Sequence, residues 1–390
     1  MTYDIIIKEL EKPTVFKNEA VLFPDYVPLN LVHREEQIRA LTRLFRVMID
    51  SPGSTLQRAI LVGDIGVGKT AVAKRFGITM ENIAKERKIN LRYVHINCYK
   101  DRTFFLIIRK IAQSLIPSIP NRGLSAQELF NLIWDYLEEN NSYILLTLDE
   151  IDFIIENETL LYFLSRIADE YINRKQRISI MLITRNLNLL YEIDRSIQST
   201  LLHNIVKFDP YTSNQLFDII KLRSKEALKE GVIDDDVLNM IAEIAASRGD
   251  ARYALELLWR AGKYADADGS NKILPEHVRK AQSDVFPFPI NIILELSLHE
   301  KLLLLSIASI LKKSKNTYTS MGEVESVYNM ICENKKIEPR KHTQLWEYVQ
   351  NLKNIGIIQA KVVNTKGRTT IISLTGIPAE KLESILSSEK

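Results

Sequence analysis

Residues 63–70 read Gly-Asp-Ile-Gly-Val-Gly-Lys-Thr and fit the spacing G-x-x-x-x-G-K-T of a phosphate-binding loop. A short apolar run at residues 59–62 precedes them, as a buried parallel strand should, and a helical pattern opens at residue 71. Backbone N–H groups of a glycine-rich turn at a helix N-terminus can surround a polyphosphate. The sequence therefore predicts a strand, a phosphate loop and a helix in this order.

The residues of this loop have separate expected tasks. Its glycines would permit left-handed turns and a close approach of the phosphates. The ammonium of Lys69 would reach the β- and γ-phosphates, and the Thr70 hydroxyl would ligate Mg²⁺, so the predicted cofactors are ATP or ADP with Mg²⁺. The residues assigned to the nucleotide are Gly63, Asp64, Ile65, Gly66, Val67, Gly68, Lys69, Thr70 and Ala71.

Two carboxylates follow another apolar run. Residues 144–148 are Ile-Leu-Leu-Thr-Leu, and Asp149 and Glu150 come directly after them. We expect Asp149 to hold Mg²⁺ through water and Glu150 to orient or deprotonate the attacking water. An acidic loop after a strand is common by itself, but its place about 80 residues after the phosphate loop favours a nucleotide site. Asp152, a third carboxylate, is expected to be structural.

The first 210 residues alternate strand and helix patterns. Strand patterns cover residues 59–62, 91–96, 144–148, 178–184 and 204–208. Helix patterns cover residues 33–48, 71–88, 104–115, 126–138 and 160–171. This alternation predicts a parallel sheet with helices on both faces. Residues 1–30 are expected to be irregular, because Pro13, Pro24 and Pro28 break any long element.

After Pro210 the pattern becomes helical, with helices predicted at residues 214–229, 235–247, 252–267 and 275–285. Two prolines within residues 286–289 predict a linker. Beyond it, helix patterns at residues 299–313, 322–334 and 339–354 precede β-patterned runs at 357–363 and 370–374. Three helices followed by a β-hairpin with a basic tip are typical of a winged helix. The predicted domains are residues 1–210, 211–286 and 290–390.

Basic residues concentrate near the C-terminus, although the whole chain of 390 residues carries a net charge of only +3. Residues 339–368 contain 6 Lys and Arg against 1 acidic residue, a balance of +5. A local basic face favours nucleic-acid binding, although a solvated helix face gives the same pattern. The two cysteines, Cys98 and Cys332, lie far apart, which indicates a reducing interior and no disulfide framework.

The sequence has no pattern of a signal peptide or of a membrane-spanning helix. Its first residues carry Asp4, Glu9 and Glu11 in place of an apolar core region. The longest apolar stretch, residues 302–311, contains two serines and is too short to span a bilayer. We therefore expect a cytoplasmic, nucleoid-associated protein without a membrane partner.

Together these motifs resemble those of AAA+ ATPases. More closely, they resemble those of the archaeal origin-recognition and replication-initiator proteins, which are related to eukaryotic origin-recognition subunits. The similar segments are residues 31–37, 63–70, 148–152, 208–211 and 249–252, together with the winged-helix pattern at the C-terminus. The resemblance therefore covers nearly the whole chain. It implies an α/β fold, with a P-loop AAA+ parallel sheet, a helical lid and a C-terminal winged-helix domain.

The resemblance also implies roles for residues outside the loop. It places a nucleotide between the sheet and the helical domain, with Val32, His33, Tyr211 and Ile219 near the base. Arg252 would be a second sensor that acts with the catalytic groups Lys69, Asp149 and Glu150. The residues assigned to DNA are Pro120, Asn121 and Arg122 in an insertion, Arg340, Lys341, His342, Thr343 and Gln344 at the start of a helix near the major groove, and Lys366, Gly367, Arg368 and Thr369 in a wing in the minor groove.

Two segments depart from the family pattern. The family usually has an asparagine directly after the fourth sheet strand, where this chain has Arg185 followed by Asn186. The family's Asp-Pro-Arg segment is Asp-Arg-Ser at residues 194–196, so the arginine finger is displaced. Both departures favour slow hydrolysis and a nucleotide-held conformational switch.

The preferred function is an ATP- or ADP-binding initiator that recognises double-stranded origin DNA, acts with related initiator subunits and helps recruit the replicative helicase. One alternative is an ATPase that regulates transcription, which also combines a P-loop unit with a winged helix. A second is a clamp loader, although this class generally lacks a C-terminal winged helix. A third is a winged helix that binds protein in place of DNA, which the +5 stretch disfavours.

Overall fold

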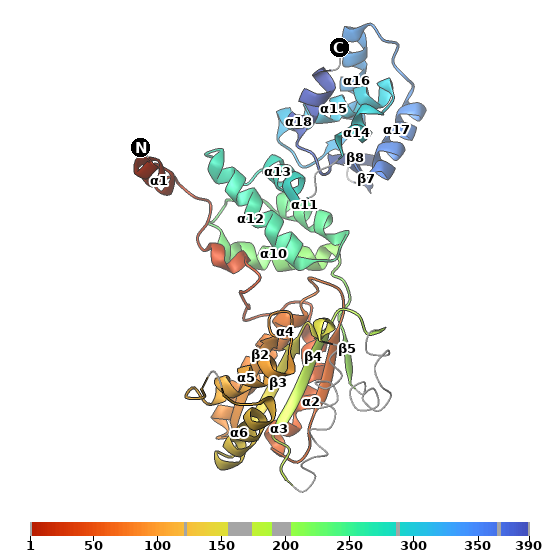
Figure 1. Cartoon of the computed structure of the whole chain (residues 1–390). Coiled ribbons are helices and arrows are strands. Elements are labelled where there is room, and N and C mark those ends of the chain that lie inside the picture. The colour runs from red at the N-terminus through yellow and green to blue at the C-terminus, as the bar shows by residue number, and fades with distance from the viewer. Residues whose placement is uncertain are drawn as a thin grey trace. The chain divides into compact units, whose positions relative to one another are not determined.

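The computed structural model describes residues 2–120, 123–154, 174–188, 204–285, 289–364 and 368–388 (Figure 1). The chain divides into two compact units. One comprises residues 27–211, and the other comprises residues 212–390 together with the first 26. Within the described ranges, no helix combines the length and the apolar character needed to cross a membrane.

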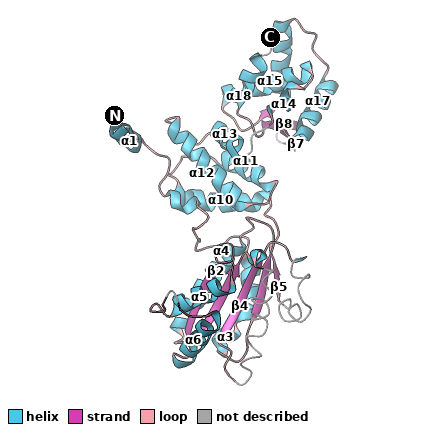
Figure 2. Cartoon of the chain, viewed as in Figure 1, coloured by secondary structure: helices cyan, strands magenta, loops and turns pink. Residues whose placement is uncertain are grey.

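The unit of residues 27–211 is built on a five-stranded sheet in the order β2-β3-β4-β1-β5, and all neighbouring strands are parallel (Figure 2). The two central strands β3 and β4 are buried along their whole length, as their continuous apolar sequences require. The predicted parallel sheet is confirmed. Its strands are β1 Arg58–Val62, β2 Asn90–Asn97, β3 Ser142–Asp149, β4 Ile178–Thr184 and β5 Ile205–Lys207.

Helices cover both faces of this sheet. Successive side chains of a strand point to opposite faces, so Leu146 of β3 joins a core with α5 and α6, while Leu145 joins a second core with α2 and α4. The helices are α2 Glu35–Phe45, α3 Val47–Asp50, α4 Lys69–Glu86, α5 Phe104–Leu115 and α6 Ala126–Glu139, with a 3₁₀ turn at Ile151–Phe153. The helix predicted at residues 160–171 lies outside the described residues.

The second unit begins with the first 26 residues, for which the expectation of an irregular chain is wrong in two places. Helix α1 spans Thr2–Leu10 and a 3₁₀ turn spans Glu19–Leu22. Pro13 lies three residues after the last residue of α1, and a proline there does not prevent a helix before it. The segment that follows α1 packs on the helical part: Lys17 N donates to Ala227 O, and Trp259 Nε1 donates to Glu19. The first 26 residues therefore group with the helical part, whereas the predicted domain of residues 1–210 grouped them with the sheet.

The helical part contains four helices, α10 Ser213–Ala227, α11 Asp235–Ala246, α12 Ala251–Ala267 and α13 Pro275–Val285. The side chain of Thr212 caps α10 reciprocally with Gln215, which explains why this helix begins directly after Thr212. Asp250 caps α12 by accepting from the backbone N–H groups of Arg252 and Tyr253.

The C-terminal part has the predicted winged-helix order of helices and strands. Its three-stranded antiparallel sheet runs β6-β8-β7. Its elements are α14 Ile290–Leu294, α15 Leu298–Ser314, β6 Thr319–Ser320, α16 Met321–Lys335, α17 His342–Ile355, β7 Ile358–Asn364, β8 Arg368–Leu374 and α18 Ala379–Ser388. The helix predicted from residue 339 begins at His342, because Lys341 is extended and occupies the N-cap position.

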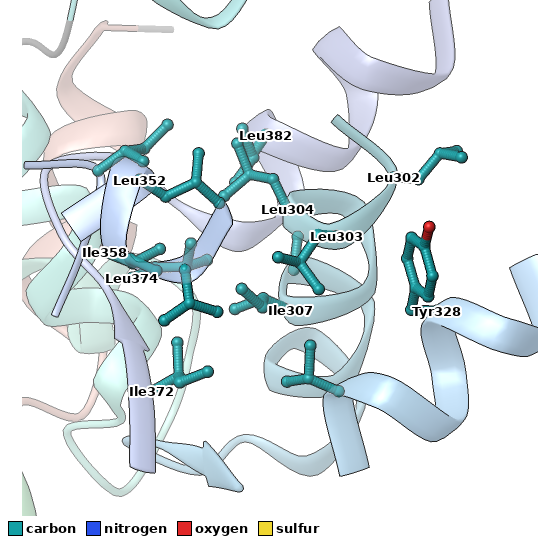
Figure 3. Close-up of a cluster of buried hydrophobic side chains, with 14 of the residues drawn as sticks. Leu302, Leu303, Leu304, Ile307, Tyr328, Leu352, Ile358, Ile372, Leu374 and Leu382 are labelled. Atoms are coloured by element: carbon teal, nitrogen blue, oxygen red, sulfur yellow. The ribbon is translucent and has the colours of Figure 1, made fainter. Parts of the chain in front are cut away.

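One hydrophobic core joins the elements of the winged helix (Figure 3). Leu303 and Ile307 of α15 lie opposite Ile372 of the sheet, and all three side chains are completely buried. Leu382 of α18 packs in the same cluster. Helices α14 and α18, which the sequence did not predict, are thus part of this core, because Ile293 and Leu382 are buried in it.

Candidate functional site

The phosphate-loop sequence forms the turn between β1 and α4. Its glycines at 63, 66 and 68 all have positive φ angles, of 156°, 76° and 89°. A Cβ atom on Gly63 would lie 2.3 Å from the carbonyl oxygen of Phe208, and one on Gly68 would lie 2.8 Å from the Tyr211 hydroxyl. The backbone can therefore take this path only with glycine at both positions.

Lys69 is the first residue of α4, and only 8% of it is exposed. Its Nζ donates hydrogen bonds to the carbonyl oxygens of Gly63 (2.6 Å) and Asp64 (2.7 Å). The ammonium is thus held over the loop beside the N-terminus of an 18-residue helix. A buried positive charge at a helix N-terminus is suited to a bound polyphosphate.

Thr70 and Asp149 meet beside the loop. Thr70 Oγ1 donates to Asp149 Oδ2 at 2.8 Å, and Asp149 is buried at the end of β3. Burial raises the pKa of Asp149, an effect that the hydrogen bond from Thr70 opposes and the charge of Glu150 reinforces. A buried carboxylate beside a hydroxyl provides the hard oxygen donors that Mg²⁺ prefers. The two residues predicted to bind the metal are therefore adjacent.

His95, which the sequence analysis did not single out, lies next to this pair. Its Nε2 is 3.5 Å from Asp149 Oδ2. Burial lowers the pKa of His95 to about 4, and Lys74 adds to this shift, so the imidazole is neutral at neutral pH. In the described part of the chain, no three His, Cys, Asp or Glu side chains are grouped to hold a metal unaided. Mg²⁺ commonly takes one or two carboxylates together with substrate phosphates, so this site suits it.

Glu150, the predicted water-activating group, is engaged by two side chains. Its backbone is left-handed, with φ 58° and ψ 47°. Arg185 Nη2 donates to Oε1 at 2.9 Å, and Asn97 Nδ2 donates to Oε2 at 3.3 Å. Asp152 accepts from the Thr184 hydroxyl at 2.6 Å and from the Arg185 backbone N–H. The sequence identified Arg185 as a departure from the family pattern, but it did not reveal this ion pair.

Arg34 connects the segment before α2 with the phosphate loop, and only 4% of it is exposed. Its guanidinium donates to the carbonyl oxygens of Val67 (3.0 Å), His33 (3.0 Å) and Asp209 (2.9 Å). It also lies over the Tyr211 ring, 3.7 Å from the centroid. Its neighbours Val32 and His33 were assigned to the site from the sequence and Arg34 was not, although all three lie in the segment 31–37 that carries the family resemblance.

Arg34→Ala is expected to destabilise residues 27–211. One buried carbonyl group, that of Val67, and two part-buried ones would lose their donor, and loss of a donor to a buried group costs about 1–3 kcal/mol before water can enter. We expect the free energy of unfolding to fall by about 2–5 kcal/mol in urea titrations. Arg39→Ala, which removes an exposed arginine from the adjoining helix α2, is the control. An equal loss in both variants would contradict the role given to Arg34.

The remaining predicted nucleotide residues belong to the other unit. Ile219 is half-buried on α10, and Arg252 is exposed in the first turn of α12. Within one unit, the Tyr211 hydroxyl lies beside Gly68 of the phosphate loop, and Arg34 links the His33 carbonyl to that of Val67. The nucleotide roles of Val32, His33, Tyr211, Ile219 and Arg252 stay predictions.

The predicted DNA residues at the start of α17 are all exposed, from Arg340 to Gln344. Tyr328 of α16 fixes this start by accepting a hydrogen bond from the backbone N–H of Arg340 at 3.2 Å. His342 Nδ1 lies 2.8 Å from Glu325 Oε2. Pro120 is exposed after α5, and Thr369 is half-buried in β8. Asn121, Arg122, Lys366, Gly367 and the side chain of Arg368 lie outside the described residues.

Three protein families match consecutive parts of the chain. Residues 55–190 match an AAA domain, residues 217–283 match the Cdc6 AAA+ ATPase-type lid domain, and residues 291–383 match the C-terminal winged-helix domain of CDC6. ORC1-type DNA replication protein 2 of Sulfurisphaera tokodaii is 40% identical over 400 residues, which cover 99% of this chain and 96% of the relative. The chain belongs to the ORC1-type DNA replication proteins.

Solved structures agree with this family. The crystal structure of Cdc6p from Pyrobaculum aerophilum has a TM-score of 0.85 and 34% identity, and the match covers 96% of this chain and 98% of that one. The Aeropyrum pernix ORC1 protein in complex with DNA has a TM-score of 0.64 and 30% identity, over 97% and 98% of the two chains. The predicted fold class, an AAA+ sheet with a helical lid and a winged helix, is confirmed.

Proposed function

We propose that this ORC1-type protein binds ATP or ADP, recognises double-stranded origin DNA and uses the nucleotide as a slow switch in replication initiation. The observation that carries the proposal is a formed phosphate loop in the same chain as a winged helix whose α17 begins with an exposed polar run. The DNA complex of the 30%-identical Aeropyrum pernix ORC1 protein supports the DNA part.

For the nucleotide, Lys69 would bind the β- and γ-phosphates, and Val32, His33 and Tyr211 would lie near the base. Thr70 and Asp149 would hold Mg²⁺, which neutralises phosphate charge when it is bound. Glu150 would orient the attacking water. Ile219 and Arg252 would complete the site from the helical lid.

For DNA, we propose a bipartite grip. The start of α17 would face base edges in the major groove, while the wing at residues 366–369 would contact the minor groove. The insertion around Pro120, Asn121 and Arg122 would add a second contact to the same duplex, and linked contacts strengthen each other. Related initiator subunits and the replicative helicase are the proposed protein partners, and association with the nucleoid would follow from DNA binding.

Selection of duplexes by the full-length protein tests this function. Purified protein with ADP is incubated with sheared genomic DNA from its own organism, and the captured fragments are sequenced. We expect repeats clustered at the few loci where replication begins. Enrichment of dispersed promoters would instead support the transcription regulator, and capture without sequence preference would contradict origin recognition.

A further inference from the structure

The ion pair between Arg185 and Glu150 has a consequence for the rate of hydrolysis. We propose that Arg185 is a positioning residue that holds the Glu150 carboxylate away from the attacking water and thereby keeps ATP hydrolysis slow. This inference rests on the proposed nucleotide function of the same site.

The contacts of Glu150 leave its carboxylate oriented by protein donors. Arg185 Nη2 donates to Oε1 at 2.9 Å, and Asn97 Nδ2 donates to Oε2 at 3.3 Å. A group that orients or deprotonates water must present an oxygen within hydrogen-bond reach of that water. The guanidinium competes with water for Oε1 and also fixes the direction in which the carboxylate points.

Arg185 is itself held in place from the segment that carries Glu150. Its backbone N–H donates to both carboxylate oxygens of Asp152, at 3.3 and 3.2 Å. Its guanidinium lies 5.8 Å from the ring centroid of Phe153, and this ring packs edge-on against Tyr99 at 4.9 Å. The arginine thus approaches Glu150 from a supported position at the end of β4.

The restraint is reversible, because the pair is partly open to solvent. The side chain of Arg185 is 42% exposed and that of Glu150 is 25% exposed. Ion pairs with this exposure shift an equilibrium by at most about fivefold. Arg185 therefore lowers the fraction of molecules with a released Glu150 without eliminating it, and the protein retains slow turnover.

The test is steady-state ATP hydrolysis by the full chain. Arg185→Gln removes the charge and keeps a side chain of similar reach, so we expect kcat to rise by up to about fivefold with KM unchanged. Arg102→Gln is the matched control, because Arg102 lies over the Tyr99 and Phe153 rings and donates its hydrogen bond to the Tyr99 carbonyl oxygen in place of Glu150. Thermal unfolding of both variants checks their folding.

A double-mutant comparison separates positioning from a general effect. In a Glu150→Gln background, Arg185→Gln should no longer raise kcat. A fall in kcat for the single variant, an unchanged kcat, or an equal rise for Arg102→Gln would each overturn the proposal. Failure of the wild type to bind a labelled ATP analogue would overturn the proposed function itself, whereas normal binding and hydrolysis with an unresponsive Arg185→Gln variant would overturn only this inference.

Discussion

Lys69→Ala is expected to weaken the binding of ATP and ADP by about 100-fold, because it removes the charge that faces the phosphates. Hydrogen bonds to charged groups are worth about 1.5–3 kcal/mol each, and Lys69 is buried against the loop carbonyls of Gly63 and Asp64. Titration of a fluorescent ATP analogue measures the loss. Lys85→Ala, which removes an exposed lysine from the same helix α4, should leave the affinity unchanged.

Glu150→Gln should behave differently from Lys69→Ala. Glu150 is assigned to the water and not to the nucleotide, so affinity should persist while single-turnover hydrolysis slows by at least about 100-fold. If both variants lost affinity to the same degree, the division of roles between the loop and the end of β3 would be wrong.

Elements with strong local signals were predicted well from the sequence. The bounds of α5, β4 and α13 agree with the prediction to the residue. A continuous apolar run or an amphipathic repeat with clear flanks is encoded by the segment itself. Short elements lack such a signal: α14 has five residues and β6 has two, and they form because distant elements provide their packing and hydrogen-bonding partners.

The candidate site was predicted only as far as local motifs reach. The phosphate loop is one continuous segment, and so is the carboxylate pair at the end of β3, so the residue order within each segment indicates its chemistry. The contacts of Asn97 and Arg185 with Glu150 depend on strand order, which places β2 and β4 on either side of β3. Arg34 reaches Asp209, which lies 175 residues away in the sequence. Such contacts follow from the tertiary fold and have no periodic signature.

Removal of four cations from the proposed DNA-binding face is expected to have the other large effect. Replacing Arg340, Lys341, Lys366 and Arg368 with alanine should weaken binding to duplex DNA by roughly 100-fold at one fixed salt concentration. Each lost phosphate contact should lower the slope of log affinity against log salt by about 0.9, so the total change should be about 3 to 4. Fluorescence anisotropy across a salt series provides both quantities.

A charge-matched variant distinguishes a DNA-binding face from a general effect of net charge. Lys313, Lys315, Lys335 and Lys381 are exposed in the same winged helix but lie outside the basic stretch at residues 339–368. Their replacement with alanine changes the net charge by the same four units, yet it should lower the slope by less than about 1. Equal losses in the two variants would mean that charge alone attracts the DNA. An unchanged affinity in the first variant would favour a winged helix that binds protein.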